Sequence, residues 1–279
     1  MSQDKVFFTC IGAQKAGTSW LQSYLSKNEN VYLPRIKEMH FFDSLCLSEN
    51  LVGDFWMGAF KERCVKALRK SDYKLAADYI DRLDVGGDKK KYQQYYLKRG
   101  KGFKVFGDIT PAYSMLDRQG FEEIRSIFPA AKIIFILRNP VERYWSFLRM
   151  QLKKNSKYPL EKKFYDVIGN DHVVLRSDYE RTMRSVDSVF PATQVLYVFY
   201  EDLFGERHKS VVNSIDSFLG LESSEGDFLQ EKINSSQAVA MSKDMRIFAA
   251  NEFKSTYYYV EEKMGYVPLS WQKDKNLFL

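Results

Sequence analysis

The stretch FFTCIGAQKAGTSWLQSYL, residues 7–25, runs from an apolar segment through a glycine-containing turn into a helical pattern. The apolar run VFFTCIG, residues 6–12, predicts a buried strand. After the turn, the apolar side chains return at helical spacing, at Trp20, Leu21, Tyr24 and Leu25. A strand that turns directly into a helix aims several backbone N–H groups and the positive end of the helix dipole at one point. The stretch therefore predicts an anion-binding loop.

The position of the lysine distinguishes this loop from the familiar nucleotide loop G-x-x-x-x-G-K-[ST], in which lysine follows the second glycine. Gly12 and Gly17 have the expected spacing, but Thr18 occupies the lysine position and Lys15 lies between the glycines. Thr18 and Ser19 add hydroxyl donors at the start of the helix. The pattern favours a phosphate compound other than ATP, and a tight strand-to-helix connection without a ligand is the alternative.

Three more apolar segments predict parallel strands and so set the fold class. They are FKVFG (103–107), KIIFIL (132–137) and QVLYVFY (194–200), and helical patterns lie between them, as in ERYWSFLRMQLKK (142–154). Strands that alternate with helices predict an α/β fold with a central parallel sheet of about four to five strands flanked by helices. The ligand crevice is then expected at the carboxyl ends of the strands.

A second anion site is predicted in FILRNPVERYWSFLRMQ, residues 135–151. Arg138 directly follows a buried strand, Asn139 can cap the next helix, and Pro140 suits its first turn. The planar guanidinium of Arg138 matches a phosphate, and Ser146, two helical turns further on, can add a hydroxyl. A surface ion pair for Arg138 and a packing role for Ser146 are the alternatives.

Two separated phosphate sites predict a ligand with two separated anionic groups, such as adenosine 3′,5′-bisphosphate. Its sulfated form, 3′-phosphoadenosine 5′-phosphosulfate (PAPS), has no β- and γ-phosphates for magnesium to chelate. The usual lysine position and an acidic metal ligand are therefore unnecessary, and no metal site is expected.

The segment RIKEMHFFD, residues 35–43, gathers Lys37, Glu38, His40 and Asp43 around an apolar pair. Sulfuryl transfer needs a base for the proton of the acceptor and a cation for the charge that develops on the leaving phosphate oxygen. Either Glu38 or His40 can be the base and Lys15 the cation. By itself, such a cluster is more often an ordinary surface turn.

Composition limits the remaining classes. With 279 residues and 45% hydrophobic content the chain can bury a sizeable core, and we expect one domain over 1–279. The net charge of +6 favours anionic ligands without requiring a nucleic-acid partner. Three dispersed cysteines, Cys10, Cys46 and Cys64, predict reduced thiols. The polar start MSQDK and the absence of a long apolar run predict a cytoplasmic protein without a membrane span, and the oligomeric state stays open.

Two further segments carry expectations about local structure. Residues 44–102 have a less regular pattern and include the basic, aromatic stretch DVGGDKKKYQQYYLKRGKGFK (84–104), which predicts a loop and helix over the crevice, either simply solvated or docking an acidic substrate. The segment SKDMRIFAANEFKSTYYYVEEKMG (242–265) predicts one core-packing helix, with Ser242 as N-cap and Gly265 as its end.

These motifs together resemble the PAPS-dependent sulfotransferase superfamily, most closely its heparan sulfate glucosaminyl branch and bacterial relatives. The resemblance implies a P-loop-NTPase-like three-layer fold. It also implies that the opening loop holds the 5′-phosphosulfate and that Arg138 and Ser146 hold the 3′-phosphate. The loop residues concerned are Gln14, Lys15, Ala16, Gly17, Thr18, Ser19 and Trp20.

The E-x-H-F-F-D stretch of that family, matched here by residues 38–43, implies Glu38 as general base, with His40 assisting or orienting it. GDITPAYS (107–114) is similar to a segment that lines the acceptor site. The expected reaction is in-line transfer from PAPS to a hydroxyl or amine, with adenosine 3′,5′-bisphosphate as product and a saccharide as the favoured acceptor. A small-molecule, lipid or natural-product alcohol is the alternative acceptor.

Two departures separate the chain from the glucosaminyl branch. Ile109 stands where those enzymes usually have a lysine before T-P or S-P, so heparan sulfate is a doubtful substrate. KINSSQAVAMS (232–242) lacks their cysteines and basic motif, which leaves Ser235 or Ser236 as guesses for closure over the nucleotide. Two other classes remain as rivals: an atypical P-loop kinase or ATPase, and a nucleotide-binding module that has lost catalysis.

Overall fold

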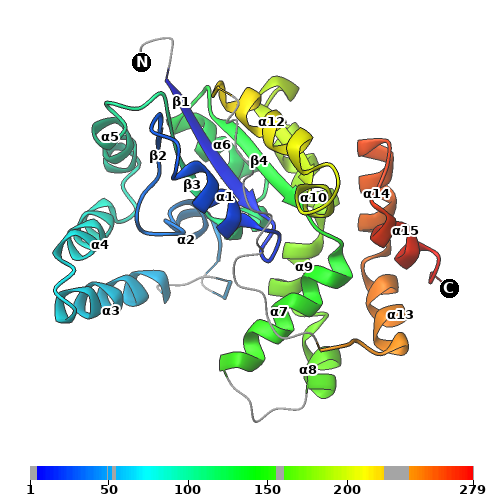
Figure 1. The fold of residues 1–279 in the computed structure, drawn as a ribbon. Coiled ribbons are helices and arrows are strands. Elements are labelled where there is room, and N and C mark those ends of the chain that lie inside the picture. The colour runs from blue at the N-terminus through cyan, green and yellow to red at the C-terminus, as the bar shows by residue number, and fades with distance from the viewer. Residues whose placement is uncertain (1–4, 49, 52–54, 155–159, 223–238, 279) are drawn as a thin grey trace.

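A five-stranded parallel sheet forms the centre of the computed structural model, which describes residues 5–48, 50–51, 55–154, 160–222 and 239–278 (Figure 1). The strands lie in the order β2-β3-β1-β4-β5, and every pair is parallel. Their bounds are β1 (Val6–Gly12), β2 (Val31–Tyr32), β3 (Val105–Ile109), β4 (Lys132–Leu137) and β5 (Val195–Phe199). The predicted fold class is confirmed, and β1 and β4 have the predicted bounds.

Two differences from the predicted strands have physical causes. β3 starts and ends two residues later than predicted, because the strand continues through Asp108, whose buried carboxylate accepts hydrogen bonds from the hydroxyls of Tyr92, Thr110 and Tyr113. β2 was not predicted, because two residues are too few to show a strand period. β5 differs from its prediction by one residue at each end.

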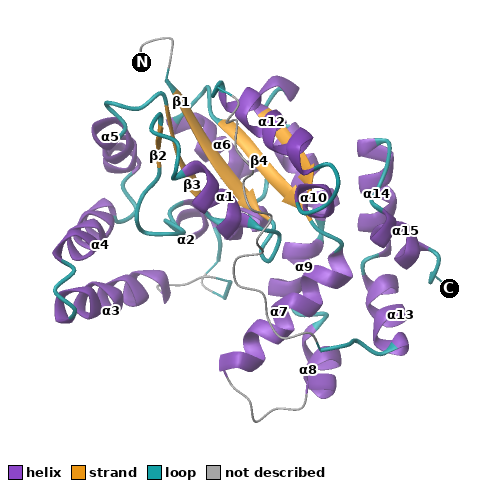
Figure 2. Cartoon of the chain, in the orientation of Figure 1, coloured by secondary structure: helices purple, strands orange, loops and turns teal. Residues whose placement is uncertain are grey.

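Helices cover both faces of the sheet, as the cartoon in Figure 2 shows. α1 and α12 lie on one face, joined by a hydrogen bond from the hydroxyl of Tyr24 to Asp216 Oδ2 (2.7 Å). α5 and α6 cover the other face, where Phe128 and Tyr96 pack against Phe7 of β1. The helical bounds are α1 (Thr18–Leu25), α2 (Phe42–Cys46), α3 (Phe55–Arg69), α4 (Tyr73–Val85), α5 (Lys89–Arg99), η1 (Pro111–Met115), α6 (Arg118–Ile127), α7 (Pro140–Lys154), α8 (Leu160–Val167), α9 (Asp171–Ser177), α10 (Tyr179–Asp187), η2 (Ala192–Gln194), α11 (Tyr200–Leu203), α12 (His208–Leu219), α13 (Lys243–Glu252), α14 (Lys254–Met264) and α15 (Leu269–Lys275).

The region expected to be irregular is helical, and the basic stretch does not lie over the crevice. It forms α5, which buries Tyr92, Tyr95 and Tyr96 against the sheet. Its far end lies at the amino edge of the sheet, where Lys5 Nζ donates to Gly100 O (2.9 Å). Acidic residues neutralise several of its charges, in the pairs Lys89–Glu123, Lys91–Asp84, Arg99–Asp78 and Arg99–Asp81. These pairs neutralise Lys89, Lys91 and Arg99, and the position of α5 away from the crevice does not support its docking of a substrate there.

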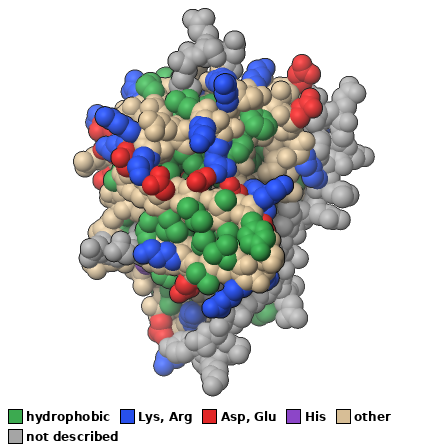
Figure 3. All heavy atoms as spheres, turned by 90° about the vertical axis from the view of Figure 1, so that its left-hand side faces the viewer, with side chains coloured by type: hydrophobic (Ala, Val, Ile, Leu, Met, Phe, Trp, Pro, Cys, Tyr) green, Lys and Arg blue, Asp and Glu red, His purple; other side chains and the backbone are tan. Residues whose placement is uncertain are grey.

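α3 and α4 pack as a helical hairpin beside this region (Figure 1). Figure 3 faces this side and shows hydrophobic side chains gathered below a band of mixed Lys, Arg, Asp and Glu. The large hydrophobic side chains that these two helices leave exposed are Phe55, Val65, Leu68, Tyr73 and Ile80.

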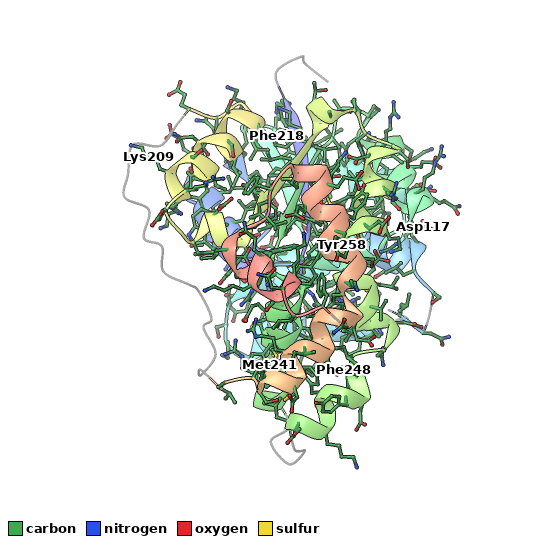
Figure 4. The ribbon with its side chains drawn as sticks, turned by 90° about the vertical axis from the view of Figure 1, so that its right-hand side faces the viewer. Asp117, Lys209, Phe218, Met241, Phe248 and Tyr258 are labelled. Atoms are coloured by element: carbon green, nitrogen blue, oxygen red, sulfur yellow. The ribbon has the colours of Figure 1, made fainter. Side chains whose placement is uncertain are left out.

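The C-terminal segment forms two helices, α13 and α14, instead of the predicted single helix. Its two ends match the prediction, since Ser242 Oγ accepts from Met245 N and Gly265 takes a left-handed conformation. The chain breaks at Phe253, whose backbone (φ −100°, ψ 15°) leaves the helical range. Figure 4 shows Phe248 on α13 and Tyr258 on α14, the helices on either side of this break. The apolar period runs across the break, so the sequence pattern did not reveal it.

A buried polar network fixes these C-terminal helices to the start of α7. Asn139 Nδ2 donates to Asp274 Oδ2 (2.8 Å), and Arg246 Nη1 donates to Asp274 Oδ1 (2.8 Å). The hydroxyl of Tyr257 donates to Asn139 Oδ1 (3.0 Å), which also accepts from Glu142 N and so caps α7 as predicted. The network holds the helix that follows Arg138 in place.

The three cysteines are free, as predicted. Burial raises the pKa of the Cys10 thiol to about 12. In the described part of the chain, no helix combines the length and the apolar character that crossing a bilayer requires.

Candidate active site

The loop between β1 and α1 lies at the carboxyl edge of the sheet, as expected. Gly17 is the N-cap of α1 with φ 85°, and no side chain caps this helix, so its first N–H groups are available to an anion. A Cβ added at Gly17 would lie 2.8 Å from Phe204 Cε2, which excludes larger residues. Gln14 Oε1 in the same loop is buried and accepts no hydrogen bond from a described residue.

Lys15 and Arg138 are brought together, although 123 positions separate them. Arg138 Nη1 donates to Lys15 O (2.6 Å), and the guanidinium lies 4.5 Å from the ring centre of Tyr200. Arg138 Nε is buried and has no hydrogen-bond partner among the described residues. Arg138, at the end of β4, thus supports the β1–α1 loop through Nη1. Its Nε–H can still donate to a ligand.

A second arginine, missed by the sequence reasoning, belongs to this region. Burial lowers the pKa of Arg149, and the positive charge of Arg138 lowers it further, so the two guanidinium groups are near each other. Arg149 follows Ser146 by three positions on α7, which places both on one helix face. Ser146 is buried and forms no hydrogen bond with Arg138 or with the loop. The charge of Glu142 opposes this effect of Arg138 on the pKa of Arg149. The i, i+3 spacing of a serine and an arginine could have suggested Arg149.

Glu38 and His40 lie together just after β2. His40 Nδ1 lies 2.6 Å from Asp43 Oδ2 and bonds to it, whereas His40 Nε2 lies 3.2 Å from Glu38 Oε2, within ion-pair distance but not aligned as a hydrogen bond. The imidazole stacks on Trp56 with ring centres 3.4 Å apart. The buried imidazole therefore lies between two carboxylates.

These contacts set the charges of both groups. Burial disfavours the charged form of Glu38, but His40, Lys37 and Arg176 outweigh it, so the pKa of Glu38 is below its usual value. Burial likewise disfavours the imidazolium, yet Asp43 and Glu38 raise the pKa of His40 above its usual value. At neutral pH, Glu38 is ionised and His40 tends to hold its proton.

Backbone strain coincides with the predicted catalytic residues. Among the described residues, positive φ outside glycine occurs at Lys15 (70°), Glu38 (67°), His40 (47°) and Ser71 (57°). Side chains other than glycine seldom adopt this conformation, which costs on the order of 1–3 kcal/mol per residue and concentrates at functional sites. Three of these four are the residues predicted as catalytic from sequence.

Lys37 connects the base region to the anion loop. Its Nζ donates to Ser19 Oγ at the start of α1 and lies 3.7 Å from Glu38 Oε1. Polar contacts therefore connect Ser19, at the end of the β1–α1 loop, through Lys37 to the carboxylate of Glu38.

The remaining predicted loop residues contribute in a more limited way. The side chain of Ala16 is fully buried, so only its backbone can face a ligand. Trp20 is also buried and stacks on Tyr24, with its edge against Phe204 and His208. Thr18 is buried in the first turn of α1. Ser235 and Ser236 lie outside the described residues.

The segment predicted to line the acceptor site supports the base region. The hydroxyl of Tyr113 donates to Asp108 Oδ2 (2.6 Å) and accepts from the backbone N–H of Phe41 (3.1 Å). Burial raises the pKa of Asp108. Ile109, which replaces the lysine of the glucosaminyl enzymes, is a core residue with 2% of its surface exposed.

A separate hollow lies elsewhere in the described residues. It measures about 600 Å³ between α11 and α15, and none of the predicted site residues lines it. In the same part of the chain, no three His, Cys, Asp or Glu side chains gather in a metal-binding arrangement. The candidate site is therefore defined by its contacts and not by the size of a cavity.

Comparison with known proteins gives a family. Residues 8–225 match the model of the Sulfotransferase family. A sulfotransferase from Alicyclobacillus acidocaldarius has a similar structure, with TM-score 0.66, 23% identity, and coverage of 96% of this chain and 99% of that one. Among curated protein sequences, none is significantly similar.

Two further structures share the fold. The sulfotransferase domain from the curacin biosynthetic pathway has TM-score 0.57 and 14% identity, covering 96% of this chain and 99% of that one. The sulfotransferase domain from the Synechococcus PCC 7002 olefin synthase has TM-score 0.53 and 18% identity, covering 81% of this chain and 77% of that one. At these identities the likeness shows the fold, and it does not single out the heparan sulfate branch.

Proposed function

The chain belongs to the Sulfotransferase family, and on this premise we propose that it transfers the sulfuryl group of PAPS to a hydroxyl or amine of an acceptor. The observation that carries the proposal is the connected set of contacts from Arg138 through the loop to Ser19, Lys37 and Glu38. It joins two anion-binding regions to an ionised carboxylate. The proposal treats residues 1–279 as one cytoplasmic domain.

The donor set fits a nucleotide with two separated phosphates. The uncapped start of α1, the hydroxyls of Thr18 and Ser19 and the cation of Lys15 suit the 5′-phosphosulfate. Arg138 Nε, which has no hydrogen-bond partner within the described part of the chain, and the hydroxyl of Ser146 suit the 3′-phosphate. Phe204 packs where a Cβ of residue 17 would lie, so a side chain at this position of the loop would have to displace its ring.

The reaction is an in-line displacement at sulfur. The acceptor oxygen or nitrogen forms a bond to sulfur as the bond from sulfur to the 5′-phosphate oxygen breaks, and adenosine 3′,5′-bisphosphate leaves. Glu38 takes the proton of the acceptor, and Lys15 stabilises the charge that develops on the leaving oxygen. Positioning and charge stabilisation supply most of the rate, as they do in phosphoryl transfer.

His40 orients Glu38 in this mechanism and does not act as the base. The two carboxylates raise the pKa of His40 and so favour its protonated form, in which neither ring nitrogen can accept a proton. Asp43 fixes the ring, and the ring in turn holds the carboxylate of Glu38 toward the acceptor.

The acid limb of the pH–rate profile separates these two roles. The pKa of Glu38 lies below 4.5, so its basic form persists as the pH falls, and kcat/KM should stay nearly constant from pH 7 to pH 5. A base with the raised pKa of His40, above 6.5, would instead lose more than about 10-fold over that range. The profile is measured with circular dichroism at each pH to exclude unfolding, and the steeper fall would reject Glu38 as base.

Nucleotide titration tests the donor and separates the rivals. Calorimetry should show binding of adenosine 3′,5′-bisphosphate and no comparable binding of ATP with magnesium, and EDTA should leave transfer unchanged. The reverse preference would favour the kinase or ATPase. Tight bisphosphate binding without transfer to any acceptor would favour the inactive module.

The class of acceptor is the least constrained part of the proposal. The family resemblance favours a saccharide, and a small-molecule, lipid or natural-product alcohol is the alternative. The buried Ile109 weighs against heparan sulfate, because the lysine expected to help hold an acidic sugar is missing.

A further inference from the structure

A small apolar cluster adjoins the base region through Trp56. Ala112 and Met115 of η1 form this cluster, separately from the main core. The partly buried side chains that pack on them are Leu47, Leu51, Trp56 and Leu175. Trp56 also stacks on His40, so the cluster begins next to the Glu38–His40 pair. Ala112 and Met115 are themselves buried, so an apolar portion of an acceptor would contact the partly buried side chains of this cluster.

Arg176 borders the same cluster from α9. Its Nη1 lies 3.0 Å from Met115 Sδ, a weak acceptor, and its buried Nε has no partner among the described residues. No carboxylate in the described chain comes within the 4.0 Å of an ion pair with it. Burial lowers the pKa of Arg176, and the charges of Asp43 and Glu38 oppose that shift. A largely buried guanidinium without an ion pair is costly unless an anion arrives.

The helix that carries Arg176 is held rigidly. Arg143 of α7 is fully buried and donates through Nη2 to Val173 O (3.3 Å) and to Ser177 Oγ (2.5 Å). From the C-terminal helices, Thr256 Oγ1 donates to Ser177 O (2.9 Å). These bonds fix the backbone on both sides of Arg176. A side chain on a fixed backbone loses less conformational entropy when it binds a ligand, so each hydrogen bond to the ligand contributes more to the affinity.

Arg176 is not part of the proposed nucleotide site, because the anion sites for the nucleotide lie around the β1–α1 loop and Arg138. Its charge acts instead on Glu38, which takes the proton of the acceptor in the mechanism above, and on Asp43, which fixes the ring of His40. A neutral saccharide would leave the guanidinium without an anion, and the aliphatic cluster offers it no hydrogen-bonding groups.

We propose that Arg176 forms an anion-binding subsite for the acceptor. The acceptor is then an amphiphilic alcohol or amine: its reactive group lies at Glu38, its apolar portion lies on the Ala112–Met115 cluster, and its carboxylate, sulfate or phosphate pairs with Arg176. This proposal rests on the proposed sulfotransfer and narrows its substrate class.

The test compares matched acceptors that differ in charge. The probes are ω-hydroxy acids of four, eight and twelve carbons against the 1-alkanols of the same length, with glucuronate and glucose as the polar pair. The wild type should favour the hydroxy acid in kcat/KM by about 10-fold or more, mainly through KM, at the longer lengths. Arg176→Gln should collapse this ratio toward one. Arg184→Gln, which removes an exposed arginine of α10, should leave the ratio unchanged.

A binding measurement separates this proposal from sulfotransfer itself. Calorimetry of 8-hydroxyoctanoate added to the protein with adenosine 3′,5′-bisphosphate should show binding that weakens about 10-fold or more in Arg176→Gln. If 8-hydroxyoctanoate binds in this way but no sulfuryl group is transferred to any acceptor, the anion-binding subsite at Arg176 stands and the proposed sulfotransfer is rejected. Transfer with equal preference for acid and alkanol, loss of bisphosphate affinity in Arg176→Gln, or no binding of any anionic probe would overturn the subsite.

Discussion

Replacing Lys15 with alanine is expected to lower turnover by about 10²–10³-fold or more, bringing it close to background. Lys15 lies in the loop between β1 and α1, where Arg138 Nη1 donates to its carbonyl, and in the proposed mechanism its ammonium group stabilises the leaving 5′-phosphate oxygen. Removing one group that stabilises charge developing in a transition state costs about this much. The measurement is single-turnover transfer from PAPS at saturating donor, which separates chemistry from binding.

The matched control is Lys27→Ala, because Lys27 is an exposed lysine just beyond the other end of α1. It should retain full activity. Lys15 is only partly buried, so Lys15→Ala should keep its thermal midpoint close to that of the wild type. Full activity in a folded Lys15→Ala variant would remove Lys15 from the mechanism.

Replacing Glu38 with glutamine is expected to lower kcat by about 10²–10⁴-fold, the usual contribution of a general base. The amide keeps the size of the side chain but cannot take the proton of the acceptor. Affinity for adenosine 3′,5′-bisphosphate should change little, because the carboxylate reaches the loop only through Lys37 and Ser19. The measurement combines steady-state kinetics with calorimetry of the bisphosphate.

Two variants make this result specific. Glu29→Gln removes an exposed carboxylate from a nearby turn and should behave as the wild type. His40→Gln should cost less than Glu38→Gln, because the imidazole positions the base and does not replace it. If His40→Gln abolishes transfer while Glu38→Gln stays within about twofold of the wild type, the two roles must be exchanged.

The most local parts of the fold were predictable from sequence. β1, its loop and the start of α1 form one continuous signal, in which an apolar run, two glycines and a helical period follow each other within 20 positions. The KIIFIL strand and the Asn139 cap were equally local. Glu38 and His40 are two positions apart and both have positive φ, so the local backbone alone brings the carboxylate next to the imidazole.

Features that depend on distant partners were missed or placed wrongly. The end of β3 requires two tyrosines and a threonine to satisfy Asp108, and Tyr92 of α5 is one of them. The stretch around α5 reads as a basic surface, yet its tyrosines pack on the sheet and its charges find acidic neighbours. The break at Phe253 lies within an unbroken apolar period.

The sequence by itself determined the α/β class, the anion loop with its displaced lysine and the local Glu38–His40 pair, because each is specified by residues a few positions apart through backbone geometry and period. Only the tertiary structure brought Arg138 to the carbonyl of Lys15, Lys37 to Ser19, and Arg176 to the cluster beside His40. Those contacts arise from parallel strands that end at one edge and from helices packed across it. No pattern along the chain records them, because burial and charge pairing act between side chains that are distant in sequence.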